Sequence, residues 1–133
     1  MINKLKKLLD NSYSPYSHFS VSSIVKMKDG NEFFGVNVEN ASYGATICAE
    51  RSAIVAAITA GYKKGDFSEI HVLCDSKQIS SSCFLCRQLI SEFFAKDAKV
   101  YFYNIDGEYV EKTVSEICPM PFSESDLKWK VDL

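Results

Sequence analysis

The segment from Cys48 to Ala60 constrains the fold more than any other part of the sequence. Its residues are strong helix formers, and its centre, Ala53 to Ile58, is apolar on nearly every side. A helix without a polar face is expected to lie inside the protein rather than on its surface. A chain of 133 residues has room for one such core, so the sequence predicts a single domain over residues 1–133.

The segments around this helix alternate between helix and strand patterns. The pattern predicts, in chain order, an N-terminal helix that ends near residues 11–12, strands at 19–25 and 33–38, a strand at 70–74, a helix at 86–94, strands at 100–103 and 109–113, and an irregular segment from 116 onward. Asp29 and Gly30 supply the tight turn of a hairpin, and Phe34, Val36 and Val38 are expected to face the core from its second strand. This order predicts an α/β fold with a mixed sheet covered by helices.

Composition narrows the class of protein. Hydrophobic residues make up 47% of the chain and charged residues 24%, which is typical of a globular protein. The formal net charge is −2, whereas a dedicated nucleic-acid binder usually carries a basic face. No apolar run approaches the roughly 18 residues that span a bilayer, and Met1 to Asp10 reads as a helix rather than a signal peptide. We therefore expect a cytoplasmic protein that binds neither nucleic acid nor membrane.

The chain has five cysteines, and their spacing points to metal chemistry. An odd number without an export signal argues against a disulfide framework. Cys83 and Cys86 have metal-ligand spacing, which by itself fits a structural zinc half-site or a redox pair. No second close pair of cysteine or histidine residues completes a four-ligand structural site.

Cys48 offers a third ligand. It begins the apolar helix as Cys83 and Cys86 begin a later one, and the positive end of a helix lowers the pKa of a thiol. Three thiolates around one zinc leave the fourth position open for water, as in a catalytic site. Glu50 could take and return the proton of that water, and Arg51, on the same helix face as Cys48, could offset the surplus negative charge.

These motifs resemble the cytidine deaminases, specifically the small homotetrameric kind with three cysteine ligands. The two zinc motifs are Cys48-Ala49-Glu50-Arg51 and Ser82-Cys83-Phe84-Leu85-Cys86-Arg87-Gln88. The resemblance continues in residues 14–21, in residues 35–43 and in the segment after Phe122, so it covers nearly the whole chain. It implies a three-layer α-β-α fold with a mixed five-stranded sheet.

The resemblance also implies a function and a role for each matching position. The reaction would be hydrolytic deamination of cytidine and deoxycytidine to uridine and deoxyuridine, part of pyrimidine salvage, with one zinc per chain. The implied roles are zinc ligation by Cys48, Cys83 and Cys86, proton transfer by Glu50, hydrogen bonding to the ligand sulfurs by Arg51, stacking near the base by Phe19, ribose binding by Asn37 and Glu39, further substrate contacts by Ala49 and Ser81, and insertion of Phe122 into a neighbouring subunit's pocket. Alternation along a strand independently places Asn37 and Glu39 on one side.

The sequence departs from the family pattern at three places. Ser82 stands at a position where the family usually has proline, Phe84 at one where it has glycine, and Ser22-Ser23 at one where it has Gly-Ala. The loss of proline loosens the turn into the helix, and Phe84 could line the pocket, fill a subunit contact or narrow ligand access. These changes leave open a deaminase of another cytosine compound such as blasticidin S. Two alternatives of other classes are a non-catalytic zinc-binding relative and a nucleic-acid deaminase.

The remaining candidate residues are expected to have no catalytic part. Cys74 ends a short apolar strand and is expected to be a buried small hydrophobic residue. Cys118 has no metal-like spacing, and His18 and His71 are expected at the surface or hydrogen-bonded within the fold. Trp129 is expected to pack on a neighbouring subunit.

Overall fold

The computed structural model describes residues 1–127, so the expected contact of Trp129 lies outside the described residues. The elements in chain order are α1 (Ile2–Leu9), β1 (Val21–Met27), β2 (Glu32–Val36), the 3-10 helix η1 (Tyr43–Ala45), α2 (Ala49–Thr59), β3 (Phe67–Cys74), α3 (Phe84–Phe93), β4 (Phe94–Tyr103), β5 (Tyr109–Thr113), α4 (Val114–Ile117) and the 3-10 helix η2 (Glu124–Leu127). The expected order of helices and strands is confirmed. The expectation of an irregular segment from residue 116 was wrong for α4 and η2. The Thr113 hydroxyl accepts a hydrogen bond from the backbone N–H of Glu116 and caps α4.

The five strands form one mixed sheet in the order β2-β1-β3-β4-β5. Only the central pair β3 and β4 is parallel, and α3 makes the crossover between these two strands. The other three pairs are antiparallel. The predicted mixed five-stranded sheet is therefore confirmed.

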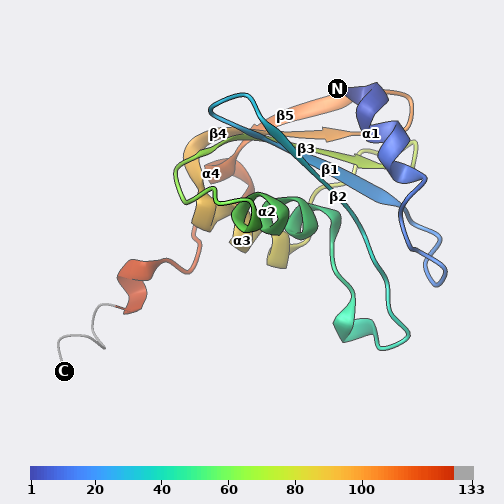
Figure 1. Ribbon diagram of the computed structural model, residues 1–133, viewed down its shortest axis with the longest axis horizontal. Coiled ribbons are helices and arrows are strands. Elements are labelled where there is room, and N and C mark those ends of the chain that lie inside the picture. Colours follow the sequence, from blue (N-terminus) through green and yellow to red (C-terminus); the bar gives the residue numbers. More distant parts are fainter. Residues whose placement is uncertain (128–133) are drawn as a thin grey trace.

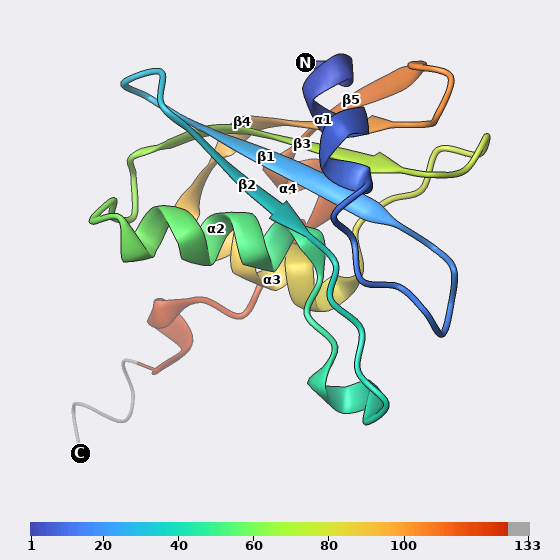
Figure 2. The same ribbon diagram turned by 45° about the vertical axis from the view of Figure 1, so that its right-hand side comes forward.

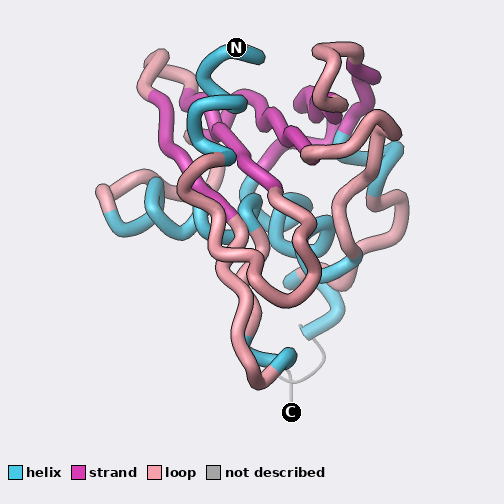
Figure 3. The backbone as a smooth tube through the Cα atoms, turned by 90° about the vertical axis from the view of Figure 1, so that its right-hand side faces the viewer, coloured by secondary structure: helices cyan, strands magenta, loops and turns pink. Residues whose placement is uncertain are grey.

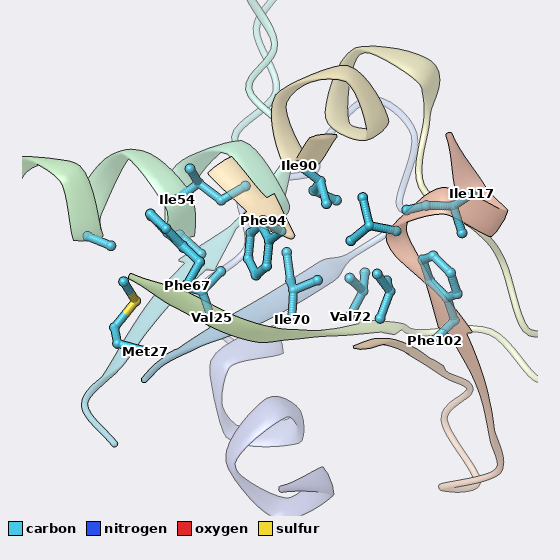
Figure 4. Close-up of a cluster of buried hydrophobic side chains, with 14 residues drawn as sticks. Val25, Met27, Ile54, Phe67, Ile70, Val72, Ile90, Phe94, Phe102 and Ile117 are labelled. Carbon is cyan, nitrogen blue, oxygen red and sulfur yellow. The ribbon is translucent and has the colours of Figure 1, made fainter. Parts of the chain in front are cut away.

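Helices cover both faces of this sheet (Figures 1 and 2). On one face α1 buries Leu5 against Ile24 and Leu73. On the other face, α2 and α3 pack over a larger apolar cluster. Figure 4 shows that cluster, in which Ile54 of α2 and Ile90 of α3 point toward the side chains of β3 and β4. The expected three-layer α-β-α arrangement is confirmed.

In β2, the second strand of the hairpin, the residues that face the helices are not the ones expected. Phe34 and Val38 are exposed, whereas Phe33 packs against the core and Gly35 is buried. The cause is the close approach of α2, because a Cβ atom at residue 35 would lie 2.3 Å from the backbone oxygen of Ala49. Glycine at this position lets the first turn of α2 rest directly on the strand.

The expectation that α2 is buried all round was wrong on one side. Ala53, Ile54 and Ala57 have no exposed surface, but Val55 is 53% exposed. Val55 lines an open hollow together with Ile47 of the preceding loop and Leu89 of α3. Among residues 1–127, therefore, α2 keeps an apolar side that is open at Val55.

The serines that replace Gly-Ala in β1 fit the core because both hydroxyls are paired. Ser22 donates a hydrogen bond to the backbone oxygen of Leu5 (2.8 Å) and Ser23 to that of His71 (3.0 Å). The His71 side chain is buried on the sheet face that carries α1. Its ring is hydrogen-bonded to the hydroxyl of Tyr103, as expected of a histidine that is hydrogen-bonded within the fold. Buried polar groups with partners carry little penalty.

Two segments extend away from the body of the molecule. Figure 3 shows the long loop that carries η1 at its tip, and Figure 1 shows the segment with η2 leaving the sheet after α4. Among residues 1–127, no helix has the length and apolar character needed to cross a membrane.

Candidate active site

Two helix starts bring the zinc-motif cysteines together. Cys48 is the N-cap of α2 and Cys83 is the N-cap of α3, and both have the extended backbone of a residue that precedes a helix. Cys86 is the third residue of α3, and the side chains of an N-cap residue and the third helical residue meet in a helix start. The unpaired N–H groups of both helices surround the same point.

The spacing of the three thiols fits a zinc ion. The sulfur atoms of Cys48, Cys83 and Cys86 all lie within 4.8 Å of one another. The Cys48 and Cys83 sulfurs are 3.7 Å apart, and those of Cys83 and Cys86 are 3.5 Å apart. Thiolates that hold a tetrahedral zinc at about 2.3 Å are separated by about 3.8 Å. The three sulfurs thus form a metal site with one side left for another ligand.

The surroundings of Cys48 favour its thiolate. A hydrogen bond from Cys86, assisted by Arg51, lowers the pKa of Cys48 to about 5, and the same contact with Cys48 raises the pKa of Cys86. The Nη2 atom of Arg51 lies 3.7 Å from the Cys48 sulfur and 3.2 Å from the backbone oxygen of Thr46. A guanidinium here balances part of the negative charge of the cluster.

Glu50 lies beside the thiols and almost out of reach of solvent. It occupies the second position of α2 and is 4% exposed. Burial raises the pKa of its carboxyl above the ordinary value, and the charge of Cys48 raises it further. The neighbouring Ser82 opposes this shift. A carboxyl with a raised pKa holds a proton more readily than a free one, which suits a group that takes and returns protons.

The thiols and Glu50 open into one pocket of about 230 Å³. Its lining consists of Phe19, Val21, Asn37, Thr46, Cys48, Ala49, Glu50, Val72, Cys74, Ser80, Ser81, Ser82 and Cys83. The lining includes four of the six residues expected to contact substrate, Phe19, Asn37, Ala49 and Ser81, but it does not include Glu39 or Phe122.

Sequence reasoning did not place Cys74 in this pocket. It is buried, as expected, but its neighbours are Glu50 and the zinc-motif loop rather than the middle of the core. Burial raises the pKa of its thiol to about 12, so it remains protonated. The signal that could have located it is its place at the carboxyl end of β3, because ligands of open α/β sheets bind at that edge.

Asn37 and Glu39 both reach the loop of residues 12–20, where each makes several hydrogen bonds. The Asn37 amide accepts hydrogen bonds from the Ser12 hydroxyl and the Val21 N–H, and donates one to the backbone oxygen of Phe19 (2.8 Å). The Glu39 carboxylate accepts from the N–H groups of Tyr16 and Ser17 and from the Ser17 hydroxyl.

The hydrogen bonds from Ser17 hold the pKa of Glu39 below its usual range, so this carboxylate is charged at neutral pH. Both side chains therefore organise the loop that carries Phe19, a role that strand alternation alone did not indicate.

Phe122 lies on the segment that follows α4 and away from Glu50. Gln88 of α3 anchors it, because the Gln88 amide donates to the Phe122 oxygen (2.7 Å) and accepts from the Phe122 N–H (3.1 Å). The Phe122 side chain is 60% exposed and borders a separate hollow of about 700 Å³ that contains no member of the thiol cluster. Within one chain, therefore, Phe122 lies beside this hollow and does not contribute to the pocket that contains Glu50.

Phe84, the residue at the family's glycine position, also points outward. Its side chain is 75% exposed and does not belong to the lining of the pocket. The guanidinium of Arg87 lies 4.5 Å from the centre of its ring, a cation–π contact. Of the roles considered for Phe84, lining this pocket is excluded within the single chain, and a contact with another subunit remains a prediction.

A three-thiol cluster that opens beside a buried carboxylate, on a three-layer α/β fold, is typical of zinc enzymes that activate water. The model of the family described as "Cytidine and deoxycytidylate deaminase zinc-binding region" matches residues 1–104. The chain belongs to this family.

Relatives match along nearly the entire chain. The cytidine deaminase of Halalkalibacterium halodurans is 40% identical over 127 residues, which cover 96% of this chain and 95% of the relative. That of Sporosarcina psychrophila is 36% identical over 132 residues, 99% and 96% of the two chains. The crystal structure of cytidine deaminase from Burkholderia pseudomallei superposes with a TM-score of 0.87 at 36% identity, covering 91% of this chain and 95% of that one.

Proposed function

We propose that this protein catalyses the hydrolytic deamination of cytidine and deoxycytidine, releasing ammonia and forming uridine and deoxyuridine. The observation that carries the proposal is the buried Glu50 carboxylate in the same pocket as the three-thiol cluster. Relatives that cover almost the whole chain bear the name cytidine deaminase. A relative that had lost catalysis would be expected to lack the proton-carrying group, and Glu50 is present.

The proposed mechanism divides the chemistry between the metal and the chain. Cys48, Cys83 and Cys86 would hold the zinc ion, which when bound would supply Lewis-acid activation of water. Glu50 takes a proton from the water that attacks C4 of the cytosine ring. Glu50 passes this proton to the ring nitrogen N3. It then takes the remaining proton of the hydroxyl formed at C4 and passes it to the amino nitrogen, so that the C4–N bond breaks, ammonia leaves and the C4 carbonyl forms. Arg51 holds Cys48 as a thiolate, and Phe19 lines the pocket where the base would lie.

The ribose would lie at the outer part of the pocket, near the loop of residues 12–20. Glu39 is the proposed partner of its hydroxyl groups, because the carboxylate is charged and retains acceptor capacity beyond its bonds to the loop. Asn37 would contribute from the pocket wall while keeping the loop in place. Ala49 and Ser81 would contact the base from the two zinc motifs.

The functional unit we propose is a homotetramer in the cytoplasm that serves pyrimidine salvage, with residues 1–133 forming one domain in each subunit. A pocket of about 230 Å³ is small beside the 300–1,000 Å³ typical of ligand sites. A neighbouring chain that inserts Phe122 would add a further wall to this pocket and close it. The uncovered side of α2 at Val55 supplies an apolar surface for such a neighbour.

A side-by-side assay tests this proposal. Purified protein is incubated separately with cytidine, deoxycytidine, blasticidin S and a cytosine-containing oligonucleotide, and ammonia release is measured. We expect turnover of the two nucleosides at rates far above the other two compounds. Turnover of blasticidin S alone, or of the oligonucleotide alone, would identify that compound as the substrate in place of the nucleosides. If zinc-loaded protein turned over none of the four compounds, an enzymatic role would be contradicted.

A further inference from the structure

Ser82 places a hydroxyl in the pocket where the zinc-deaminase signature has a proline. The residue is 5% exposed and lines the pocket together with Glu50. Its backbone is held in place, because Nε of Arg87 donates to the Ser82 oxygen (2.7 Å). A proline side chain offers a ligand no hydrogen bond, whereas a serine hydroxyl can both donate and accept.

This hydroxyl has no well-aligned partner among the described residues. The Ser82 oxygen is shielded from solvent and makes no regular hydrogen bond within the protein. Its neighbour is the Glu50 carboxyl, whose pKa the Ser82 hydroxyl lowers as a hydrogen-bond donor would. By comparison, the amide of Asn37, which also lines the pocket, makes three hydrogen bonds through its oxygen and nitrogen.

A buried hydroxyl without a partner is unfavourable, and proteins rarely retain one that serves nothing. Because this one lines the pocket, a bound molecule could supply the missing bond. The chemistry of the proposed reaction indicates which part of that molecule lies there. Glu50 returns a proton to the amino nitrogen at C4, so a group next to Glu50 is also next to that nitrogen.

We propose that the Ser82 hydroxyl accepts a hydrogen bond from the exocyclic amino group of the substrate while it donates its own hydrogen to the Glu50 carboxylate. This inference rests on the proposed function and deepens it. One hydroxyl can make both bonds at once, since its lone pairs and its hydrogen point in different directions. Ser82 thereby selects pyrimidines that carry a donor at C4 and orients the carboxylate that protonates it.

A binding comparison tests the contact with the amino group. In a Glu50→Gln background, which prevents turnover, the affinities of cytidine and of the pyrimidin-2-one ribonucleoside are measured by calorimetry with and without Ser82→Ala. The second ligand has only a hydrogen at C4. We expect Ser82→Ala to lower the affinity for cytidine by about tenfold, which corresponds to the loss of one hydrogen bond. The affinity for the other ligand should remain nearly unchanged. Equal weakening of both ligands, or of neither, would overturn the inference.

A kinetic comparison tests the effect on the reaction. In the otherwise unchanged chain, Ser82→Ala is expected to lower kcat/KM for cytidine by about 10- to 100-fold, as for a hydrogen bond to a charged group, with unchanged zinc content. Ser91→Ala is the matched control, because that hydroxyl lies on α3 and already donates to the oxygen of Gln88.

A Ser82→Ala protein within about twofold of its parent would overturn the inference, since the loss of one hydrogen bond changes an equilibrium by more than that. Failure of the proposed function gives a different result, in which the parent protein itself does not deaminate cytidine.

Discussion

The two halves of the candidate pocket are built in different ways. The half that contains Cys48, Cys83 and Glu50 comes from two helix starts, and its members meet within one chain. The half expected to hold the ribose and cover the base comes from loops, and Phe122 remains outside it. The difference teaches that the fold of one chain assembles the chemical centre, whereas it leaves Phe122 outside the pocket that contains Glu50, where we propose that a neighbouring chain completes the enclosure.

The thiol half should fail completely when one ligand is removed. Cys83 is the best choice because it is exposed and its loss disturbs no packing. We expect Cys83→Ala to reduce zinc from about one ion per chain to a small fraction and to abolish deamination, because two thiolates hold zinc poorly. Elemental analysis and the cytidine assay measure both effects. Cys118→Ala, which changes a cysteine outside the cluster, should keep both, and a Cys83→Ala protein with normal zinc would break the comparison.

Glu50→Gln should separate metal binding from catalysis within the same half. The amide keeps the shape of the side chain but cannot carry a proton, so we expect a loss in kcat of about 10²- to 10⁴-fold, the usual contribution of a general acid–base group. Zinc content and the unfolding transition should stay unchanged. Glu111→Gln on the surface of β5 is the matched control. Near-normal turnover by the Glu50 variant would remove this carboxylate from the mechanism.

The loop half should respond to Phe122→Ala through the assembly. We expect kcat/KM to fall by about tenfold, as for the minority of interface side chains whose truncation costs more than about 1 kcal/mol. Mixing this variant with Glu50→Gln should then restore activity above that of either protein alone, because mixed assemblies contain sites with an intact Glu50 and a neighbour's Phe122. Mixtures no more active than the average of the two would show that Phe122 acts within its own chain or not at all.

Asn37 and Glu39 should give the smallest effects on turnover and should differ in kind. Asn37→Ala leaves the Val21 N–H and the Phe19 oxygen without partners, so we expect the free energy of unfolding to drop by about 1–3 kcal/mol in urea titrations. Glu39→Gln should barely change stability and should raise KM for cytidine several-fold. If Asn37→Ala raised KM without loss of stability, its amide would belong to substrate binding rather than to the loop.

The elements of the fold were largely predictable, and the failures have physical causes. Helix and strand patterns are local, so the order of elements and the mixed sheet followed from residue spacing. The prediction of which side of β2 faces the core was wrong because the contact with α2 lies at Gly35, and a glycine has no side chain to count as apolar. The burial of α2 was overestimated at Val55 because sequence pattern does not distinguish a core surface from one that another chain could cover.

By itself the sequence determined the parts of the site that depend on neighbours along the chain. Cys83 and Cys86 meet because an N-cap residue and the third helical residue always approach each other, and Glu50 follows Cys48 closely in the first turn of α2. Only the tertiary structure decided that the two helix starts face one point, that Cys74 reaches the same pocket, and that the Ser82 hydroxyl is left unpaired there. These outcomes depend on contacts between segments far apart in the chain, and no local spacing encodes them.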